Sequence, residues 1–411
     1  MKISEKIRSD SVKYMVDGIG HVTDTFGKRF PGTQGEKDAQ AYFKTELEKI
    51  CDTVTDEKFE LHPNSFMDWI YITATLLILS LAAYFFAPII SIILVLLAFI
   101  PMVSQLVLYK TWFDPLYKKA ESVNVYGVIK PKGEVKRRII VNGHADATEE
   151  WFWLYKFGMK GMVTVFIGSL IGAVYVVVIS CISIDLADAS GIFVQATAEN
   201  ASLVLGLIGL VFLVVWAALY KFHNKKVVVD GANDNLTACY VSLAVPKALK
   251  EAGIKLQNTE LCVLISGAEE AGLRGAKAFA KNHPELKNSP ENIPTVVICM
   301  ETLRESEHFC LYTKDINGIV KNDLDTAALV REAGKKNGID LPYATVTLGA
   351  TDAAAFAQAG IRSTCLSGLD HNLQSYYHTR EDTKDNLSPE TLGKAFDIVT
   401  DTVLLYDEKG L

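Results

Sequence analysis

The sequence predicts a mixed α/β domain with a largely parallel sheet and helices on both faces, interrupted by two transmembrane helical hairpins. Two features of the 411 residues predict this fold. Strand-like runs alternate with amphipathic helical stretches in the polar part of the chain, a pattern typical of such sheets. Two long uncharged stretches interrupt that part, and 49% of all residues are hydrophobic. The chain is therefore long and apolar enough for one large domain plus membrane helices.

Charge and cysteine content exclude some classes of protein. The formal net charge of -7 argues against a nucleic-acid partner, which would require a basic surface. The seven cysteines are scattered and form no Cys-x-x-Cys pair, so we expect reduced thiols in the cytoplasm rather than disulfides or a thiolate metal site. The first residues carry charges with no apolar stretch behind them, which predicts that they are not a signal peptide.

The two uncharged stretches are each long enough for a helical hairpin. A helix needs ~20 apolar residues to cross the bilayer, and residues 67–109 fit two crossings, about 67–87 and 89–109, that turn near Pro88. Residues 161–220 fit two more, about 161–184 and 201–220, joined by a loop with Asp185, Asp188 and Glu199. We therefore expect an integral membrane protein with four helices, in contact with the lipid bilayer.

The flanking charges predict the orientation of these helices. Basic residues gather on the side shared by the open ends of both hairpins, namely Lys110, Lys118, Lys119, Lys156, Lys160, Lys221, Lys225 and Lys226. The opposite turns carry none. The positive-inside rule places both termini and all the polar sequence in the cytoplasm. The apolar stretches carry no charged residue within a span, which favours anchors over a transport path.

The polar remainder, residues 1–66, 110–160 and 221–411, is expected to form the three parts of one catalytic domain. Strands are predicted at 58–62, 123–129, 138–142, 260–266 and 295–300, and helices at 38–49, 236–252, 272–282 and 322–337. In sheets of this kind, ligands bind beyond the carboxyl ends of the strands.

Polar motifs follow the predicted strands. His144 and Asp146 follow the strand at 138–142, Glu269 and Glu270 follow 260–266, and Glu301 follows 295–300. Two further motifs lie in loops, Asp230-Gly-Ala-Asn-Asp-Asn235 and Tyr377-His-Thr-Arg-Glu-Asp-Thr383. Each motif alone is weak evidence, but five at the expected positions predict one shared site.

The residue types suit two divalent metal ions. Imidazole and carboxylate ligands without thiolate favour zinc, with cobalt or manganese as alternatives. One shared carboxylate can hold two ions ~3.5–4 Å apart with a hydroxide between them. A neighbouring carboxylate that binds no metal then takes the proton from the water.

These motifs, with the lead-in Arg29-Phe-Pro-Gly-Thr-Gln-Gly35, resemble those of metallopeptidase family 28, the co-catalytic dizinc aminopeptidases and glutamate carboxypeptidase-like exopeptidases. The resemblance covers the polar sequence and stops at the hairpins. It implies that His144 and Glu301 bind one ion, that Glu270 and His378 bind the other, and that Asp234 bridges both. It further implies that Asp146 orients the ring of His144 and that Glu269 is the general base.

The sequence departs from the family pattern in three ways. Glu301 replaces the more usual aspartate, and Thr351-Asp352-Ala353 stands where many members have Ser-Asp-His. The membrane insertions have no counterpart in the secreted members. None of the three removes a metal ligand, and His371 is the one rival to His378 as a ligand.

These features predict a membrane-bound exopeptidase that acts on peptides. An aminopeptidase is the leading prediction. An amide hydrolase that removes an acyl group, or a cyclase, is the alternative on the same fold. A catalytically inactive membrane scaffold is the non-enzymatic alternative, and the complete set of ligands and base argues against it. The residues do not indicate which end of a peptide is bound, which side chains are preferred or how many copies assemble.

Overall fold

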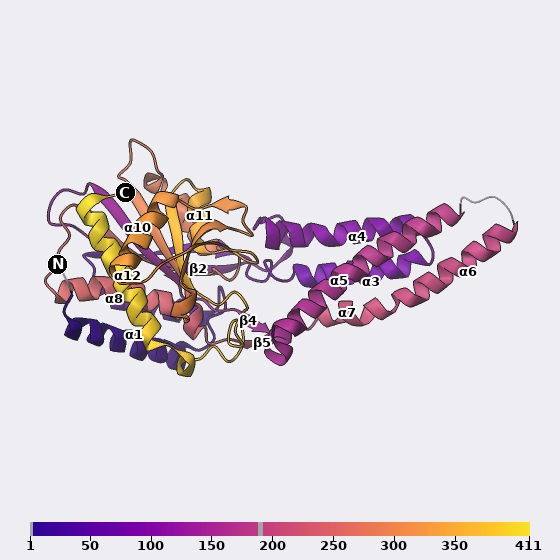
Figure 1. The fold of residues 1–411 in the computed structure, drawn as a ribbon, viewed down its shortest axis with the longest axis horizontal. Coiled ribbons are helices and arrows are strands. Elements are labelled where there is room, and N and C mark those ends of the chain that lie inside the picture. Colours follow the sequence, from indigo (N-terminus) through magenta and orange to yellow (C-terminus); the bar gives the residue numbers. More distant parts are fainter. Residues whose placement is uncertain (1–2, 188–191) are drawn as a thin grey trace. The chain divides into compact units, whose positions relative to one another are not determined.

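The computed structural model describes residues 3–187 and 192–411. It divides into two compact units. The first, here called the α/β unit, comprises Met1–Pro63, Lys118–Glu149 and Lys226–Leu411. The second, here called the helical unit, comprises Asn64–Tyr117 and Glu150–Lys225. Both units are drawn in Figure 1.

The α/β unit is built on a mixed sheet with the strand order β1-β2-β6-β3-β7-β11-β8-β10, and β9 pairs with β8. Its strands are β1 (Thr53–Leu61), β2 (Ala120–Ile129), β3 (Arg137–His144), β6 (Thr259–Ser266), β7 (Thr295–Leu303), β8 (Cys310–Asp315), β9 (Val320–Lys321), β10 (Tyr343–Thr345) and β11 (Arg362–Gly368). The strands β6, β3, β7 and β11 run parallel in the middle, which confirms the predicted largely parallel sheet.

Helices cover both faces of this sheet. They are α1 (Glu5–Phe26), α2 (Gln34–Glu48), α8 (Thr237–Glu251), α9 (Arg274–Asn282), α10 (Leu324–Lys336), α11 (Asp352–Gln358) and α12 (Pro389–Lys409). The helices α1, α8 and α12 pack against one another, and α9 packs against α11 (Figure 1). This two-sided cover explains why all eight residues of β6 are buried, as expected for a central parallel strand.

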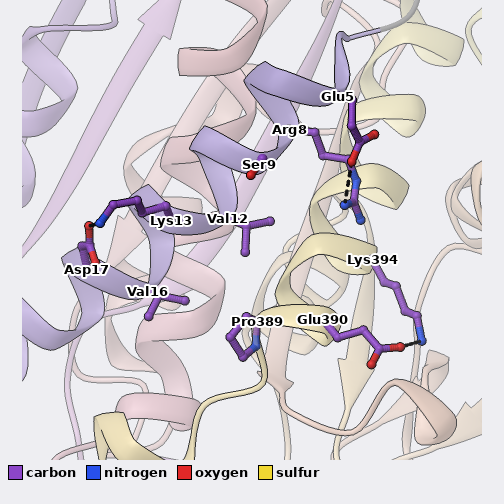
Figure 2. Close-up of a pocket in the computed structure, with 10 residues that line it drawn as sticks. All are labelled: Glu5, Arg8, Ser9, Val12, Lys13, Val16, Asp17, Pro389, Glu390 and Lys394. Carbon is purple, nitrogen blue, oxygen red and sulfur yellow. Dashed lines mark hydrogen bonds and ion pairs between the residues drawn. The ribbon is translucent and has the colours of Figure 1, made fainter.

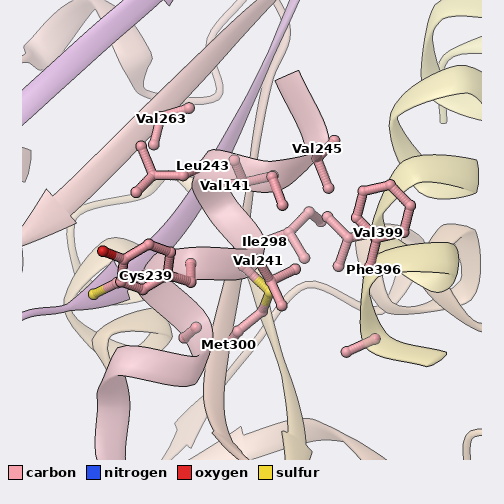
Figure 3. Packing of buried hydrophobic residues seen from close by; sticks show 14 of the residues in the cluster. Val141, Cys239, Val241, Leu243, Val245, Val263, Ile298, Met300, Phe396 and Val399 are labelled. Atoms are coloured by element: carbon pink, nitrogen blue, oxygen red, sulfur yellow. The ribbon is translucent and has the colours of Figure 1, made fainter. Parts of the chain in front are cut away.

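The main hydrophobic core lies between the central strands and the layer of α8 and α12. Figure 3 shows Val141, Val263 and Ile298 from the strands facing side chains of the two helices. Phe396 on α12 is 1% exposed, and the valines of α8 are fully buried. Burial of each such side chain stabilises the fold by ~1.5–3 kcal/mol, so this layer fixes the positions at which the strands end.

The helical unit contains α3 (Trp69–Tyr84), α4 (Pro88–Met102), α5 (Phe152–Ala187), α6 (Ile192–Gly209) and α7 (Val211–Leu219). A π-helical segment, Val103–Val107, continues α4. The small strands β4 (Glu149–Trp151) and β5 (His223–Val228) pair with each other where the chain enters α5 and leaves α7. Of the acidic residues expected in the loop after α5, Asp188 lies outside the described residues.

Three helices among the described residues are long and apolar enough to cross a membrane: Pro88–Val107, Phe152–Asp185 and Glu199–Leu219. The first predicted span corresponds to Trp69–Tyr84, which has 16 residues and is shorter than the ~20 that a crossing needs. The helix ends at this point because the chain turns before Pro88, the first residue of α4. The count of two transmembrane hairpins is therefore not confirmed and stays a prediction.

Candidate metal centre

Three of the parallel strands bring four predicted site residues to one edge of the sheet. His144 is the last residue of β3, Glu301 lies near the end of β7, and Glu269 and Glu270 follow β6. His144 is in register with Ser266, the last residue of β6. The carboxyl ends of parallel strands meet at the same edge, which is why motifs far apart in the sequence converge here.

Two loops supply the remaining candidate ligands. Asp234 lies in the short segment Ala232–Leu236 before α8, and His378 lies in the loop between β11 and α12. Asp382 links the two loops, because its carboxylate accepts hydrogen bonds from the backbone N–H groups of Asn233 (2.8 Å) and Asp234 (3.1 Å). This contact fixes the segment that carries Asp234.

His144, Asp234 and Glu301 form the first ligand group. Nε2 of His144 lies 3.4 Å from Oδ1 of Asp234 and 3.6 Å from Oε1 of Glu301. Two ligands of a tetrahedral zinc ion, each ~2.0–2.1 Å from the metal, are about 3.3 Å apart. The spacing is longer than that of good hydrogen bonds and close to that of ligands that share one ion.

Asp234, Glu270 and His378 form the second group. Nε2 of His378 lies 2.9 Å from Oδ2 of Asp234 and 3.2 Å from Oε1 of Glu270. Asp234 therefore directs Oδ1 toward one group and Oδ2 toward the other. A carboxylate placed in this way can be shared by two cations.

The buried polar atoms fit a metal. Neither ring nitrogen of His144 has a hydrogen-bond partner, and the same holds for Oε1 of Glu270 among the described residues. Buried polar atoms of folded proteins almost always have partners, and a bound cation would supply one here. The imidazole and carboxylate donor set, without thiolate, suits zinc.

The electrostatics of the site also favour a bound metal ion. Burial by itself lowers the pKa of His144, but the nearby carboxylates outweigh it and raise that pKa well above its ordinary value. The same balance raises the pKa of His378 to about 10. Burial, together with the charge of Asp234, raises the pKa of Glu301 to about 8. A site that crowds carboxylates in this way favours a cation between them.

Asp146 and Glu269 lie beside the ligands and belong to neither group. Oδ1 of Asp146 is 3.4 Å from Nδ1 of His144. Its two oxygens also accept hydrogen bonds from the backbone N–H groups of Glu269 (3.1 Å) and Glu270 (2.9 Å). Oε2 of Glu269 lies 3.9 Å from Nε2 of His144, and burial raises the pKa of Glu269 well above its ordinary value. The structure thus brings all seven predicted site residues together.

Arg29, a residue without a predicted role, joins the loops behind the site. It is fully buried, and its guanidinium donates to the carbonyl oxygens of Ala145 (2.7 Å) and Asp230 (2.5 Å). These carbonyls lie in the segments that follow β3 and precede Asp234. Arg29 opens the lead-in sequence that the family resemblance singled out, and this was the one available signal.

Glu36 supports the turn after β6 in a similar way. Its buried carboxylate accepts hydrogen bonds from the backbone N–H groups of Gly32 (2.6 Å) and Ala268 (2.8 Å) and from the Ser122 hydroxyl (2.8 Å). Burial raises the pKa of Glu36 to about 8. A glutamate on an amphipathic helix resembles an ordinary surface residue, so no sequence signal distinguished it.

Other residues considered from the sequence lie outside the two ligand groups. His371 is exposed, and its Nε2 contacts the Tyr312 hydroxyl at 3.2 Å. Asp352 is buried and accepts a hydrogen bond from Ser266 Oγ at 2.6 Å.

A groove between the starts of α1 and α12 (Figure 2) is lined by residues such as Arg8, Val12 and Lys394, and by none of the ligands. That groove is separate from the metal centre.

The mixed sheet and the two groups of imidazole and carboxylate side chains are those expected from the predicted resemblance to zinc exopeptidases. Residues 219–403 match the sequence model of peptidase family M28. The predicted resemblance is confirmed. Aminopeptidase YwaD of Bacillus subtilis is 30% identical over 178 residues, which are 42% of this chain and 37% of that protein. The chain thus spans little more than a third of this relative's length.

Solved structures show the same fold. A zinc aminopeptidase from Bacillus subtilis has a TM-score of 0.54 and 16% identity, with 97% of this chain and 95% of that chain covered. An aminopeptidase from Aneurinibacillus sp. strain AM-1 has a TM-score of 0.56 and 15% identity, with 95% of this chain and 93% of that chain covered. A glutaminyl cyclase from Bacteroides thetaiotaomicron has a TM-score of 0.53 and 14% identity, with 98% of each chain covered. At these identities the likeness concerns the fold alone.

Proposed function

We propose that this protein is a membrane-bound aminopeptidase with two zinc ions in its active site. The position of Asp234 is the observation that supports it most, since each carboxylate oxygen belongs to a different ligand group. The match of residues 219–403 to peptidase family M28 and the fold shared with a zinc aminopeptidase support hydrolysis of peptide bonds with zinc. In this proposal His144 and Glu301 hold one ion, Glu270 and His378 hold the other, and Asp234 bridges them.

Each of the other site residues has a defined task in this proposal. Two ions held by these residues would supply Lewis-acid chemistry, polarising the substrate carbonyl and lowering the pKa of a water molecule. Glu269 accepts the proton of that water on its carboxylate and passes it to the leaving amine. Asp146 holds the imidazole of His144 in one orientation and fixes the backbone N–H groups of Glu269 and Glu270. Arg29 and Glu36 keep the loops in place.

Metal analysis combined with a substrate panel tests this function. Purified protein is assayed on amino-acid amides, on peptides with free or blocked amino termini and on amino-terminal glutaminyl peptides, with and without chelator. We expect two zinc ions per chain and chelator-sensitive release of amino-terminal residues. Turnover of blocked peptides at an equal rate would contradict an aminopeptidase.

A cyclase is the second candidate, because a glutaminyl cyclase shares the fold. Ring closure of glutaminyl peptides without hydrolysis would establish it. Release of the acyl group from N-acyl amino acids would instead support an amide hydrolase. Full metal content with no turnover on any of these substrates would support the inactive scaffold.

We further propose that the apolar helices span the bilayer and that both termini lie in the cytoplasm. A single cysteine replaces Glu199 or Lys409 in a variant that lacks Cys51 and Cys181. An impermeant thiol reagent added to intact cells is expected to label residue 199 and not residue 409. The opposite pattern would invert the topology.

A further inference from the structure

The positive charge of the helical unit is confined to short segments. Its sequence contains no arginine and five lysines, which are Lys110, Lys156, Lys160, Lys221 and Lys225. None lies within 69–109 or 161–220. Lys110 follows the helix α4 and its π-helical extension, Lys156 and Lys160 lie at the start of α5, and the remaining two follow α7.

Contacts within the unit bring these segments to one end of the helices. The ring of Tyr71 at the start of α3 stacks on Tyr220 after α7, with 5.9 Å between centroids. Nε1 of Trp153, at the start of α5, donates to the carbonyl of Ala218 at 2.9 Å. The helices α3 and α4 pack together as a hairpin, which places the end of α4 beside the start of α3.

Four of the five lysines have an ammonium group that no carboxylate of the described residues neutralises, and Nζ of one of them, Lys156, lies 4.8 Å from the centre of the Tyr155 ring. Lys225 pairs with Asp68 at 2.7 Å. Lys110, Lys156, Lys160 and Lys221 are exposed and form no ion pair with the residues that the structure describes. The nearby carboxylates are engaged elsewhere, since Asp114 and Glu150 are buried and accept hydrogen bonds from Ser65 and Asn224. The exposed charge at this end is therefore positive.

Exposed aromatic side chains accompany the lysines. Trp112 and Phe157 are both 64% exposed, and Tyr220 is 41% exposed. The helix α5 breaks at Gly158, where φ is 62°, so the segment with Phe157 is set off from the long apolar helix behind it. Aromatic rings of this kind lie at the level of lipid headgroups, and lysines beside them extend toward the phosphates.

The opposite end of the helices has a different chemistry. Phe86 is 90% exposed there, and the charged side chains described nearby are the acidic Asp185 and Glu199. The two ends therefore share aromatic residues and differ in charge. Aromatic anchoring alone would not need this difference.

We propose that Lys110, Lys156, Lys160 and Lys221, together with Trp112 and Phe157, form a collar that binds the headgroups of anionic phospholipids. The positive collar complements a headgroup that carries a net negative charge, whereas the zwitterionic phosphatidylcholine headgroup gains little from it. Each lysine near an anionic surface contributes about a fivefold preference. The collar rests on the proposed membrane embedding and is independent of peptidase activity.

Tryptophan fluorescence gives a direct test, because all five tryptophans belong to the helical unit and Trp112 lies in the collar. The full-length protein is reconstituted in bilayers that contain brominated phosphatidylglycerol or brominated phosphatidylcholine. We expect the brominated anionic lipid to quench with about fivefold or higher relative affinity. The quadruple variant K110Q/K156Q/K160Q/K221Q should lose this preference, and the corresponding lysine-to-arginine variant should keep it.

Matched controls separate the collar from general effects of charge. The variant K130Q/K132Q/K136Q/K255Q removes four lysines of the α/β unit and should leave the preference unchanged. High salt should weaken the preference of the wild-type protein, because exposed charges are screened. Equal quenching of the wild type by both lipids, or an undiminished preference in the collar variant, would overturn the proposal. Peptidase turnover is measured separately, so an inactive but lipid-selective protein would contradict the proposed function alone.

Discussion

The two units distribute polar and apolar side chains in opposite ways. The α/β unit buries ionisable groups completely, among them Arg29, Glu36, His144 and Asp234. The helical unit instead exposes apolar groups. Among the large apolar side chains that the described residues expose, only Ile319, Leu324, Tyr343, Leu348 and Leu411 belong to the α/β unit.

This contrast shows which side chains of each unit are energetically unfavourable in water or in the protein interior. Buried charges are expensive unless they are paired or bind a cation, so the α/β unit concentrates that cost at one edge of its sheet. The exterior of the helical unit would be equally unfavourable in water, and a lipid environment removes that cost. The two units therefore suit different solvents.

The largest effect is expected from separating the units. Leu61 pairs with Ala120 across β1 and β2, and the Val229 N–H donates to the carbonyl of Thr148 at 3.0 Å. Short turns can therefore replace 64–117 and 150–225 without stretching the chain. We expect a protein that is soluble without detergent and keeps its metal content, as measured by gel filtration and metal analysis.

A control for this excision is the same shortened protein with His144 and His378 replaced by alanine, which should be soluble and free of metal. Aggregation of both forms would show that the α/β unit depends on the helical unit. The contrast between two independent units would then be wrong.

The second prediction concerns Asp234 within the α/β unit. Replacing Asp234 by alanine removes the one carboxylate common to both ligand groups, so both ions and all turnover should be lost. Asp230→Ala, in the same loop but in neither group, should keep both. A full metal complement in D234A would show that Asp234 does not bridge.

A smaller effect is expected for the proposed base. Glu269→Gln keeps the shape of the side chain and cannot accept a proton, so the rate should fall by ~10²–10⁴ with metals retained. The neighbouring Glu270→Gln should lose metal as well. Rates and metal content of the two variants are compared, and a fall of less than about tenfold in E269Q would assign the base elsewhere.

Asp146→Asn tests the support behind the ligands. The amide keeps the size of the side chain but weakens its hold on the imidazole of His144, so metal affinity should fall ~10–100-fold in a chelator competition. Asp315→Asn removes a buried carboxylate outside the ligand groups and serves as the control. Equal affinities of both variants would exclude a specific role for Asp146.

The smallest effect is expected at the surface of the α/β unit. The hydrogen bond with Glu57 raises the pKa of His283 above its ordinary value of 6.5. The stabilisation is therefore fully present below pH 6.5 and is lost as the pH rises through the raised value. Glu57→Gln should lower the melting temperature at about pH 5.5 and have little effect at about pH 9. The side chains are partly exposed, so the difference should stay below ~1 kcal/mol.

The convergence of the site residues could be predicted because most of them follow strands that the sequence marks clearly. The runs before His144, Glu269 and Glu301 are largely apolar and rich in β-branched residues, which fixes where each strand ends. The position of the two Asp234 oxygens does not by itself confirm which residues bind metal or which one is the base. Those roles stay predictions.

Other parts could not be predicted, because their signals depend on tertiary contacts. The strands β8 and β11 contain few consecutive apolar residues, and α1 and α12 carry polar faces that hide their buried stripes. Arg29 and Glu36 are ordinary charged residues in the sequence and acquire their roles only through backbone groups of distant loops. The predicted number of crossings was not confirmed at Trp69–Tyr84, where the apolar stretch continues but the helix ends.

The interruption of the α/β unit by the helical unit also determines when the site can form during synthesis. His144 leaves the ribosome before α5, Asp234 only after α7, and His378 close to the end of the chain. At usual rates of translation, roughly 10–50 s separate the first ligand from the last. A nascent chain therefore completes its apolar helices before both ligand groups can assemble. Synthesis order alone would thus delay the proposed peptidase activity until the apolar helices have been made.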